Sequence, residues 1–461
     1  MPCRQIIRVL DELPSRTYNT LTGETMKKVI KVAALGASCI ALATTAFAAD
    51  LNMNIYGASA QGKFWNEYAS QFLEAPVSAG GMGCTVGGSV KGYVPSNSKL
   101  GITVGFNCAG NGGDDIYIRY TENKSVEGPR AVMNLDPQEN DTCITGNPTN
   151  DNLRKQADWN GSAIVEACKE VHVGASDVAS ESFTQESHGY ENGMYNTTQF
   201  DEVLAGQVIP GVAEIGTARQ PIIVPFSFFA NTSLAVDHIN RQQALLLMSG
   251  NVNNWNQFGP GYENKKVVLC MRHAGSGTHA TLDKAILRGD TKLPTQQVIN
   301  VPPFVPAAGI MFHTSSSDLM KCVHENGKYS TATAGAIGYA DSDKPVETVA
   351  ADGTETFASK YNMTKRLRYN GGGEGMTAAN MTAFGYSALK NEIMNGSYEF
   401  WSSQWMYIDQ TQEVPATNTL FTKMMDYAST APLSCPGVGC YWLTANDLNV
   451  TKADDTSVPR F

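Results

Sequence analysis

Residues 272–278 have the side chains and the spacing of an oxyanion-binding loop. The segment reads Arg-His-Ala-Gly-Ser-Gly-Thr and lies between a predicted strand, Val267–Met271, and a predicted helix. Its glycines allow the backbone to approach an anion closely, and the unpaired N–H groups and dipole of the first helical turn favour negative charge. Arg272 can present its planar donors to two oxygens at once. An ordinary capped turn has the same composition, so the loop alone leaves both interpretations open.

The loop needs strands and helices to position it, and the pattern of apolar residues predicts them. Expected strands are 51–56, 116–120, 171–173, 222–229, 267–271 and 336–340. Expected helices are one with aromatic residues at 64, 65, 68 and 72, and the ranges 163–169, 240–248, 378–394 and 417–427. A glycine-rich hairpin is expected within 80–113, and a polar surface insertion at about 136–159. Because strands alternate with helices, the sequence predicts an α/β fold with mostly parallel sheets.

The N-terminal segment is typical of a secretory signal peptide. Lysines at 27, 28 and 31 precede an apolar run, Val32–Leu42, which is followed by Ala46-Phe47-Ala48. We expect cleavage near Ala48 and a periplasmic or extracellular protein. Met26 is the expected start of translation, or else residues 1–25 extend a leader without further function.

The length of the remaining chain predicts two lobes. Removing 48 residues from 461 leaves 413, which is more than one hydrophobic core usually organises. We place the crossings between lobes at the strands 222–229 and 336–340. The first lobe is then 49–224 plus 341–461, and the second lobe is 225–340.

The cysteines predict disulfides rather than metal ligands. Eight of the ten cysteines lie beyond the leader: Cys84, Cys108, Cys143, Cys168, Cys270, Cys322, Cys435 and Cys440. An even number in an exported chain favours disulfides, and pairing neighbours in order is the simplest arrangement. There is no Cys-x-x-Cys, so the sequence favours neither a metal site nor a redox cofactor. The net charge of −10 also disfavours nucleic acid and anionic membranes as partners.

Four segments together resemble the phosphate-specific substrate-binding proteins of ABC transporters. Arg272-x-x-x-Ser276-Gly277-Thr278 is similar to the phosphate loop of that family, and Gly174-Ala175-Ser176-Asp177 is similar to one of its strand ends. Residues 239–255 resemble its helix, glycine stop and tryptophan, and Gly335–Tyr339 resembles its return strand. The matches occur in the family's order over roughly 55–339. The resemblance implies a two-lobed periplasmic-binding-protein fold with a ligand cleft between the lobes.

The resemblance also assigns roles to individual residues. It makes Arg272, Ser276, Gly277 and Thr278 the ligands of the second lobe, and it makes Asp177 a buried acceptor. Residues 120–128 are similar in spacing to the family's first-lobe serine loop, and this similarity implies that Ser125 is a ligand of the first lobe. The loop 57–61 matches the family's first phosphate loop, where the register leaves Ser59, Ala60 and Gln61 to share one role. Val126 and Glu127 depart from the small residues usual in the family.

Asp177 is the residue that bears most on the choice of anion. A carboxylate only accepts hydrogen bonds, so it tolerates an anion that carries a proton and disfavours one that does not. Hydrogen phosphate and hydrogen arsenate satisfy this condition, whereas sulfate does not. The alternative is that Asp177 is a helix N-cap. His279 also resembles the Ser-Gly-Thr-His run of tungstate-binding relatives, so tungstate or molybdate is a second ligand class; both His273 and His279 are otherwise expected to face solvent.

The sequence therefore predicts a monomeric solute-binding protein that captures phosphate and delivers it to a membrane ABC permease. One alternative is an extracellular sensor or scaffold with the same fold. Another is a phosphoester hydrolase with Ser276 as nucleophile, although no Gly-x-Ser-x-Gly motif surrounds this serine. We expect no enzyme activity.

Overall fold

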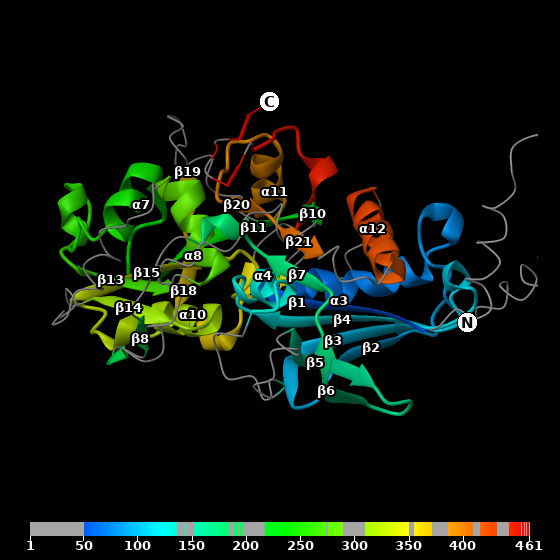
Figure 1. Ribbon diagram of the computed structural model, residues 1–461. Coiled ribbons are helices and arrows are strands. Elements are labelled where there is room, and N and C mark those ends of the chain that lie inside the picture. Colours follow the sequence, from blue (N-terminus) through cyan, green and yellow to red (C-terminus); the bar gives the residue numbers. More distant parts are fainter. Residues whose placement is uncertain are drawn as a thin grey trace, which may run out of the picture. The chain divides into compact units, whose positions relative to one another are not determined.

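The computed structural model describes most of the chain after residue 49 (Figure 1). The described residues are 50–135, 143, 152–183, 189–191, 194–196, 217–272, 275–288, 309–349, 355–370, 386–408, 415–430, 442–452, 454–455, 457 and 459–460. The predicted leader, His273, Cys435 and Cys440 lie outside them.

The first sheet is built around the N-terminal strand. Its strand order is β10 (Thr217–Arg219), β21 (Trp405–Ile408), β7 (Val173–Ser176), β1 (Leu51–Ala58), β4 (Ile116–Asn123), β3 (Asn97–Gly105), β2 (Val90–Val94). Strands β7, β1 and β4 are parallel, and antiparallel strands extend the sheet on both sides. The carboxyl ends of β7, β1 and β4 therefore meet at one edge.

Helices α3 (Ser59–Glu74) and α12 (Pro415–Thr430) lie beside this sheet in Figure 1. The aromatic face predicted for α3 is confirmed, because Phe64, Trp65, Tyr68 and Phe72 are buried in the main core. The Tyr68 hydroxyl donates a hydrogen bond to the carbonyl of Tyr427 on α12, at 3.2 Å. The short helix α4 (Glu127–Val132) packs against β7 and β1.

The second sheet also has a parallel centre. Its strand order is β14 (Ile310–His313), β13 (Lys266–Arg272), β15 (Ala334–Asp341), β11 (Ile222–Asn231), β18 (Thr364–Arg366), and β20 (Trp401–Ser403) and β22 (Leu443–Thr444) also pair with β11. Strands β14, β13 and β15 are parallel, and β11 is antiparallel to its partners. Helix α10 (Ser316–His324) packs on β15 and β13, and α7 (Arg241–Met248) and α8 (Gly277–Thr281) also contact β13.

Smaller elements complete the described chain. They are the helix α11 (Tyr386–Met394) and the strand pairs β5 (Leu153–Trp159) with β6 (Ile164–Glu170), β8 (Gly189–Glu191) with β9 (Met194–Asn196), β12 (His238–Asn240) with β19 (Arg368–Asn370), and β16 (Val346–Val349) with β17 (Glu355–Phe357). None of the helices in the described ranges combines the length and apolar composition that a bilayer crossing requires.

The C-terminal part of the chain contributes to both sheets. Strand β21 joins the first sheet, whereas β18, β20 and β22 join the second. The sequence placed all of 341–461 in the first lobe, so the division of the chain into lobes stays a prediction at these boundaries.

One expected helix is a strand. Residues 163–169 were predicted to be helical, but Ile164–Glu170 forms β6 and pairs antiparallel with β5. The β-branched Ile164 and Val165 favour this conformation, and the pairing with β5 supplies the hydrogen bonds. The expected hairpin within 80–113 is confirmed as β2 and β3.

Three of the four disulfides expected from the order of the cysteines are confirmed. Cys84 pairs with Cys108, Cys143 with Cys168, and Cys270 with Cys322. The third bond joins β13 to α10, and therefore ties the strand that carries Arg272 to the neighbouring helix.

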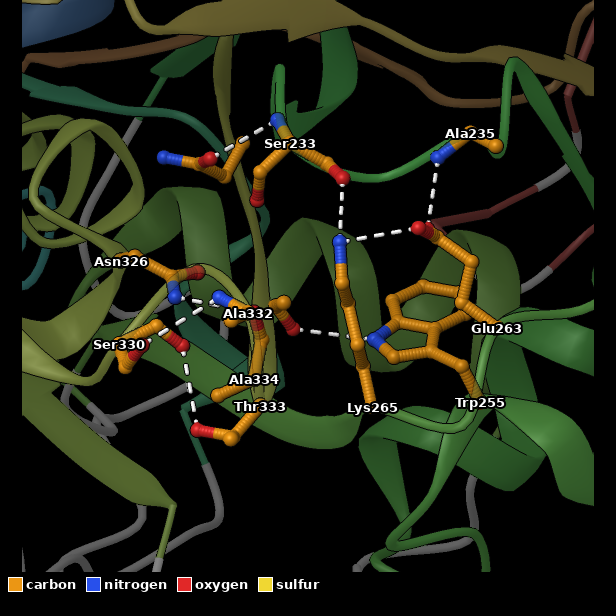
Figure 2. Close-up of polar contacts among 12 residues, drawn as sticks. Ser233, Ala235, Trp255, Glu263, Lys265, Asn326, Ser330, Ala332, Thr333 and Ala334 are labelled. Atoms are coloured by element: carbon orange, nitrogen blue, oxygen red, sulfur yellow. Dashed lines mark hydrogen bonds and ion pairs between the residues drawn. The ribbon is translucent and has the colours of Figure 1, made fainter.

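Two of the four segments on which the resemblance depends meet in the second sheet. Trp255 is fully buried, and its indole N–H donates to the carbonyl of Gly335 at 3.0 Å (Figure 2). Nearby, the Lys265 ammonium donates to the carbonyl of Ser233 at 2.5 Å and pairs with Glu263 at 2.9 Å. The side chain of Asn326 donates to the carbonyl of Ala334 at 3.0 Å. These contacts fix the start of β15, the predicted return strand.

Candidate anion-binding site

The loop after β13 has the predicted strand–loop–helix geometry. Arg272 is the last residue of β13, and Ser276 is the N-cap of α8, where its hydroxyl oxygen accepts a hydrogen bond from the backbone N–H of His279 at 3.4 Å. Gly277 and Thr278 form the first turn, and both are buried. The backbone N–H groups at this helix start are the kind that bind anions.

Arg272 is buried and held by neutral acceptors. Its Nη1 donates to the hydroxyl of Ser316 at 2.6 Å, and its Nη2 donates to the carbonyl of Thr314 at 2.9 Å. Its Nε is buried with no hydrogen-bond partner among the described residues. In that part of the chain no carboxylate lies within ion-pair distance of Arg272. Among the described residues, the guanidinium therefore has a fixed orientation, no carboxylate in an ion pair with it, and an Nε donor that is not used.

The first sheet supplies a carboxylate and a hydroxyl at the same edge. Ser125 follows β4 and Asp177 follows β7, which are the two strands that flank β1. Both residues are buried, and the Ser125 hydroxyl donates to Asp177 Oδ2 at 2.6 Å. The other oxygen, Oδ1, is buried with no partner among the described residues. The nearest helical turn, Ser180–Ser182, has Ala179 as its N-cap, so Asp177 does not have the alternative role of a cap.

Burial controls the charge of Asp177. Desolvation raises its pKa from 3.8 to about 7, and the nearby Asp341 adds to this rise. The hydrogen bond from Ser125 and the positive charge of Arg272 oppose it. The pKa of Asp177 therefore lies close to neutral pH, where both the protonated and the charged form are present.

Gly277 brings the two halves of the site together. A Cβ atom at this position would clash with the Ser125 hydroxyl and with the Asp177 carboxylate. The start of α8 therefore lies directly against the Ser125–Asp177 pair, and only glycine fits there. Four of the predicted ligands are in this way placed at one site: Ser125, Asp177, Arg272 and Gly277.

The loop 57–61, in which Ser59, Ala60 and Gln61 were predicted to share one ligand role, lies next to Asp177. These three residues differ in burial and in contacts. Gln61 is fully buried, and its Nε2 donates to the carbonyls of Ser176 at 2.9 Å and Trp405 at 3.3 Å. Its Oε1 accepts from the indole N–H of Trp65 at 3.0 Å. The Gln61 amide is therefore used within the fold, whereas Ser59 is exposed and Ala60 is half-buried at the start of α3.

His279 does not face solvent, contrary to the expectation from sequence. Its ring is buried and hydrogen-bonded through Nδ1 to the Tyr339 hydroxyl, which also accepts from the backbone N–H of Arg272 at 3.1 Å. Burial and the charge of Arg272 lower the pKa of His279 to about 3. The return strand β15 thus supports the loop through Tyr339, a role that sequence reasoning missed.

Thr314 and Ser316 were also missed. The signal was present as the hydroxyl-rich run Thr314-Ser315-Ser316-Ser317 after a short apolar stretch.

The described residues also include a cluster of possible metal ligands, Cys270, His313 and Cys322. Their ligand atoms lie within 4.8 Å of one another. Because the two cysteines form a disulfide, they offer no thiolate to a metal.

Comparisons with known proteins agree with the sequence resemblance. Residues 213–430 match the family model of a PBP superfamily domain. Among curated proteins, none matches the sequence. The matched range contains Arg272 and α8 but neither Ser125 nor Asp177.

Solved structures that match include several phosphate-binding proteins. A phosphate-binding protein from Stenotrophomonas maltophilia is 12% identical, with a TM-score of 0.39, and the match covers 86% of this chain and 87% of that one. A human phosphate binding apolipoprotein is 15% identical, with a TM-score of 0.37 and coverage of 82% and 88%. An ABC-type phosphate transport receptor from Vibrio cholerae is 13% identical, with a TM-score of 0.28 and coverage of 45% and 66%. This chain thus spans slightly less than two thirds of the Vibrio receptor.

The predicted α/β fold class is confirmed by the two sheets with parallel centres and their helices, and residues 213–430 match the model of a PBP superfamily domain.

Proposed function

We propose that this protein reversibly binds hydrogen phosphate, or the chemically similar hydrogen arsenate, at the site formed by Ser125, Asp177 and the 272–278 loop. The observation that carries the proposal is a pair of unused groups. Among the described residues, Arg272 Nε is a buried cationic donor without an acceptor, and Asp177 Oδ1 is a buried acceptor without a donor. Gly277, in the loop that begins at Arg272, lies against the Asp177 carboxylate, which brings the two halves of the site together.

A protonated oxyanion satisfies both groups. Its negative oxygens accept from Arg272 and from the N–H groups of the 277–278 turn, and its own O–H donates to Asp177. An unprotonated anion such as sulfate places an oxygen against the Asp177 acceptor. A buried polar group left without a partner costs about 1–3 kcal/mol, and like charge adds to that penalty. The same reasoning disfavours tungstate and molybdate.

We propose a binding role rather than catalysis. In the hydrolase alternative, His279 would have to take a proton from Ser276. With a pKa of about 3, His279 is too weak a base for that role near neutral pH. The Ser276 hydroxyl is placed as the cap of α8.

The proposed cellular role is capture of phosphate outside the cytoplasm and delivery to an ABC permease. The match to a PBP superfamily domain supports this role, and so does the predicted signal peptide. We propose that the protein acts as a monomer in the periplasm or outside the cell.

Isothermal titration calorimetry of the purified protein at pH 8 tests the proposal. Phosphate and arsenate are expected to bind, and sulfate, tungstate and molybdate are expected to bind at least about a hundredfold more weakly. Absence of heat with phosphate, or equal affinity for sulfate, would overturn the proposed specificity. Tighter binding of tungstate than of phosphate would favour the alternative ligand class.

A further inference from the structure

The geometry points to Thr314 and Ser316 as positioning residues that hold the Arg272 guanidinium for the anion. We call the segment Thr314–Ser316 the arginine clamp. This inference rests on the proposed function, because it concerns how the same site keeps its cation in place. The clamp residues need not touch the anion themselves.

Strand register places the clamp beside Arg272. Strand β14 runs parallel to β13, and its last residue, His313, is the register partner of Arg272. The residues that follow β14 therefore emerge at the same sheet edge as the 272–278 loop. Helix α10 begins immediately afterwards at Ser316.

The clamp fixes the orientation of Arg272 without neutralising it. Ser316 Oγ and the Thr314 carbonyl accept from the two terminal nitrogens, at 2.6 and 2.9 Å. Both acceptors are neutral, so the positive charge remains available to a ligand. The Nε edge is left without a protein partner in the described chain. A freely rotating arginine would lose side-chain entropy on binding, and a held one avoids most of this loss.

Two features brace the clamp. The Ser315 hydroxyl caps α10, because it accepts from the backbone N–H of Asp318 at 3.1 Å and donates to the Asp318 carboxylate at 2.6 Å. The Cys270–Cys322 disulfide ties α10 to β13 two residues before Arg272. The clamp is therefore fixed at its helix and at the strand whose arginine it holds.

Neighbouring serines thus have separable roles, which provides a matched pair of variants. Ser316→Ala removes one acceptor from Arg272, and we expect roughly tenfold weaker phosphate binding, together with some loss of stability because a buried donor of Arg272 is left without its partner. Ser316→Thr restores the acceptor and is expected to restore most of the affinity. Ser315→Ala removes the cap that braces the clamp but no acceptor of Arg272, so it is expected to lower the melting temperature and to weaken phosphate binding less than Ser316→Ala does.

A further variant distinguishes positioning from general structural support. Lysine cannot be held as a planar fork. In an Arg272→Lys background, Ser316→Ala is therefore expected to have almost no further effect on phosphate affinity. An equal loss in both backgrounds would overturn the clamp, because the serine would then act independently of the guanidinium.

Calorimetry with inorganic phosphate and thermal unfolding of the full protein and these variants give the result. If the wild type binds phosphate and Ser316→Ala binds equally well, the clamp is wrong and the proposed function stands. If the wild type does not bind phosphate, the proposed function fails and the clamp fails with it.

Discussion

Arg272 and Arg366 are two buried arginine side chains of the same sheet, and they are held in different ways. Arg366 forms a bidentate pair with Glu355, with contacts of 2.9 to 3.1 Å, and both side chains are less than a tenth exposed. Among the residues that the structure describes, the Arg272 side chain is hydrogen-bonded only to the neutral Ser316 hydroxyl and Thr314 carbonyl. The first arginine has its counter-charge in the protein. Arg272 has no carboxylate within ion-pair distance among the described residues, and Asp341, Asp177 and Asp318 act on it only from farther away. Under the proposed function, the bound anion supplies the close counter-charge.

The largest expected effect is the loss of stability in Arg366→Ala. Removing one partner of a buried ion pair leaves an uncompensated charge and typically costs about 3–5 kcal/mol. Arg366→Ala is therefore expected to lower the free energy of unfolding by about that amount in urea titrations. An unchanged free energy of unfolding in Arg366→Ala would contradict the difference proposed between the two arginines.

Arg272→Ala should affect anion binding more than it affects stability. Arg272→Ala is expected to weaken phosphate, arsenate and residual sulfate binding together, by about a hundredfold, because it removes a charge-assisted donor to each. Its unfolding free energy is expected to change less than that of Arg366→Ala. Calorimetry and urea unfolding of the two variants side by side measure both quantities, and a larger stability loss in Arg272→Ala would contradict the assignment.

The pH dependence of the unfolding free energy tests whether the Asp177 carboxyl group is buried as described. The pKa of Asp177 is about 7 in the fold, raised from 3.8, so between about pH 4 and 7 the folded protein holds a proton that the unfolded chain has lost. The contribution of Asp177 to the unfolding free energy therefore falls as pH rises through this window, by an amount on the order of 4 kcal/mol, and is constant above it.

Asp177→Asn removes this contribution and provides the control. The difference in unfolding free energy between the ligand-free wild type and the variant is expected to change from pH 4 to pH 7. A difference that is independent of pH would show that Asp177 is not the buried acceptor described above.

The smallest expected effect comes from Gly277. An alanine methyl group would meet the Ser125 hydroxyl and the Asp177 carboxylate. Gly277→Ala should therefore separate the two halves of the site and weaken phosphate binding by about tenfold, although alanine favours the helix by about 1 kcal/mol. Unchanged affinity would indicate that the contact is not needed for binding.

Local sequence patterns predicted the parts of the site that depend on neighbouring residues. The 272–278 loop, the strand end at Asp177 and the serine after β4 were each predicted from short motifs that resemble those of a known family. Three disulfide pairings also followed from sequence order.

Features that depend on distant partners were missed. Ser316 reaches Arg272 through the register of β14 on β13, across 44 positions of sequence. His279 is buried because Tyr339, 60 positions later, lies over it. Residues 164–170 were missed for a different reason: they form a hairpin with β5, and its local signals, the Asn160-Gly161 turn and the β-branched Ile164 and Val165, were present in the sequence. No local pattern encodes the contacts of Ser316 and His279.

The most direct test of the central claim is the ratio of phosphate to sulfate affinity in the wild type and in Asp177→Asn, measured by calorimetry at pH 8. At this pH the Asp177 carboxylate is mostly charged and accepts only from an anion that brings a proton. An asparagine amide can also donate, so the account predicts that the variant binds sulfate more tightly and that the ratio falls by at least about tenfold. A ratio that stays the same in the variant would contradict the account.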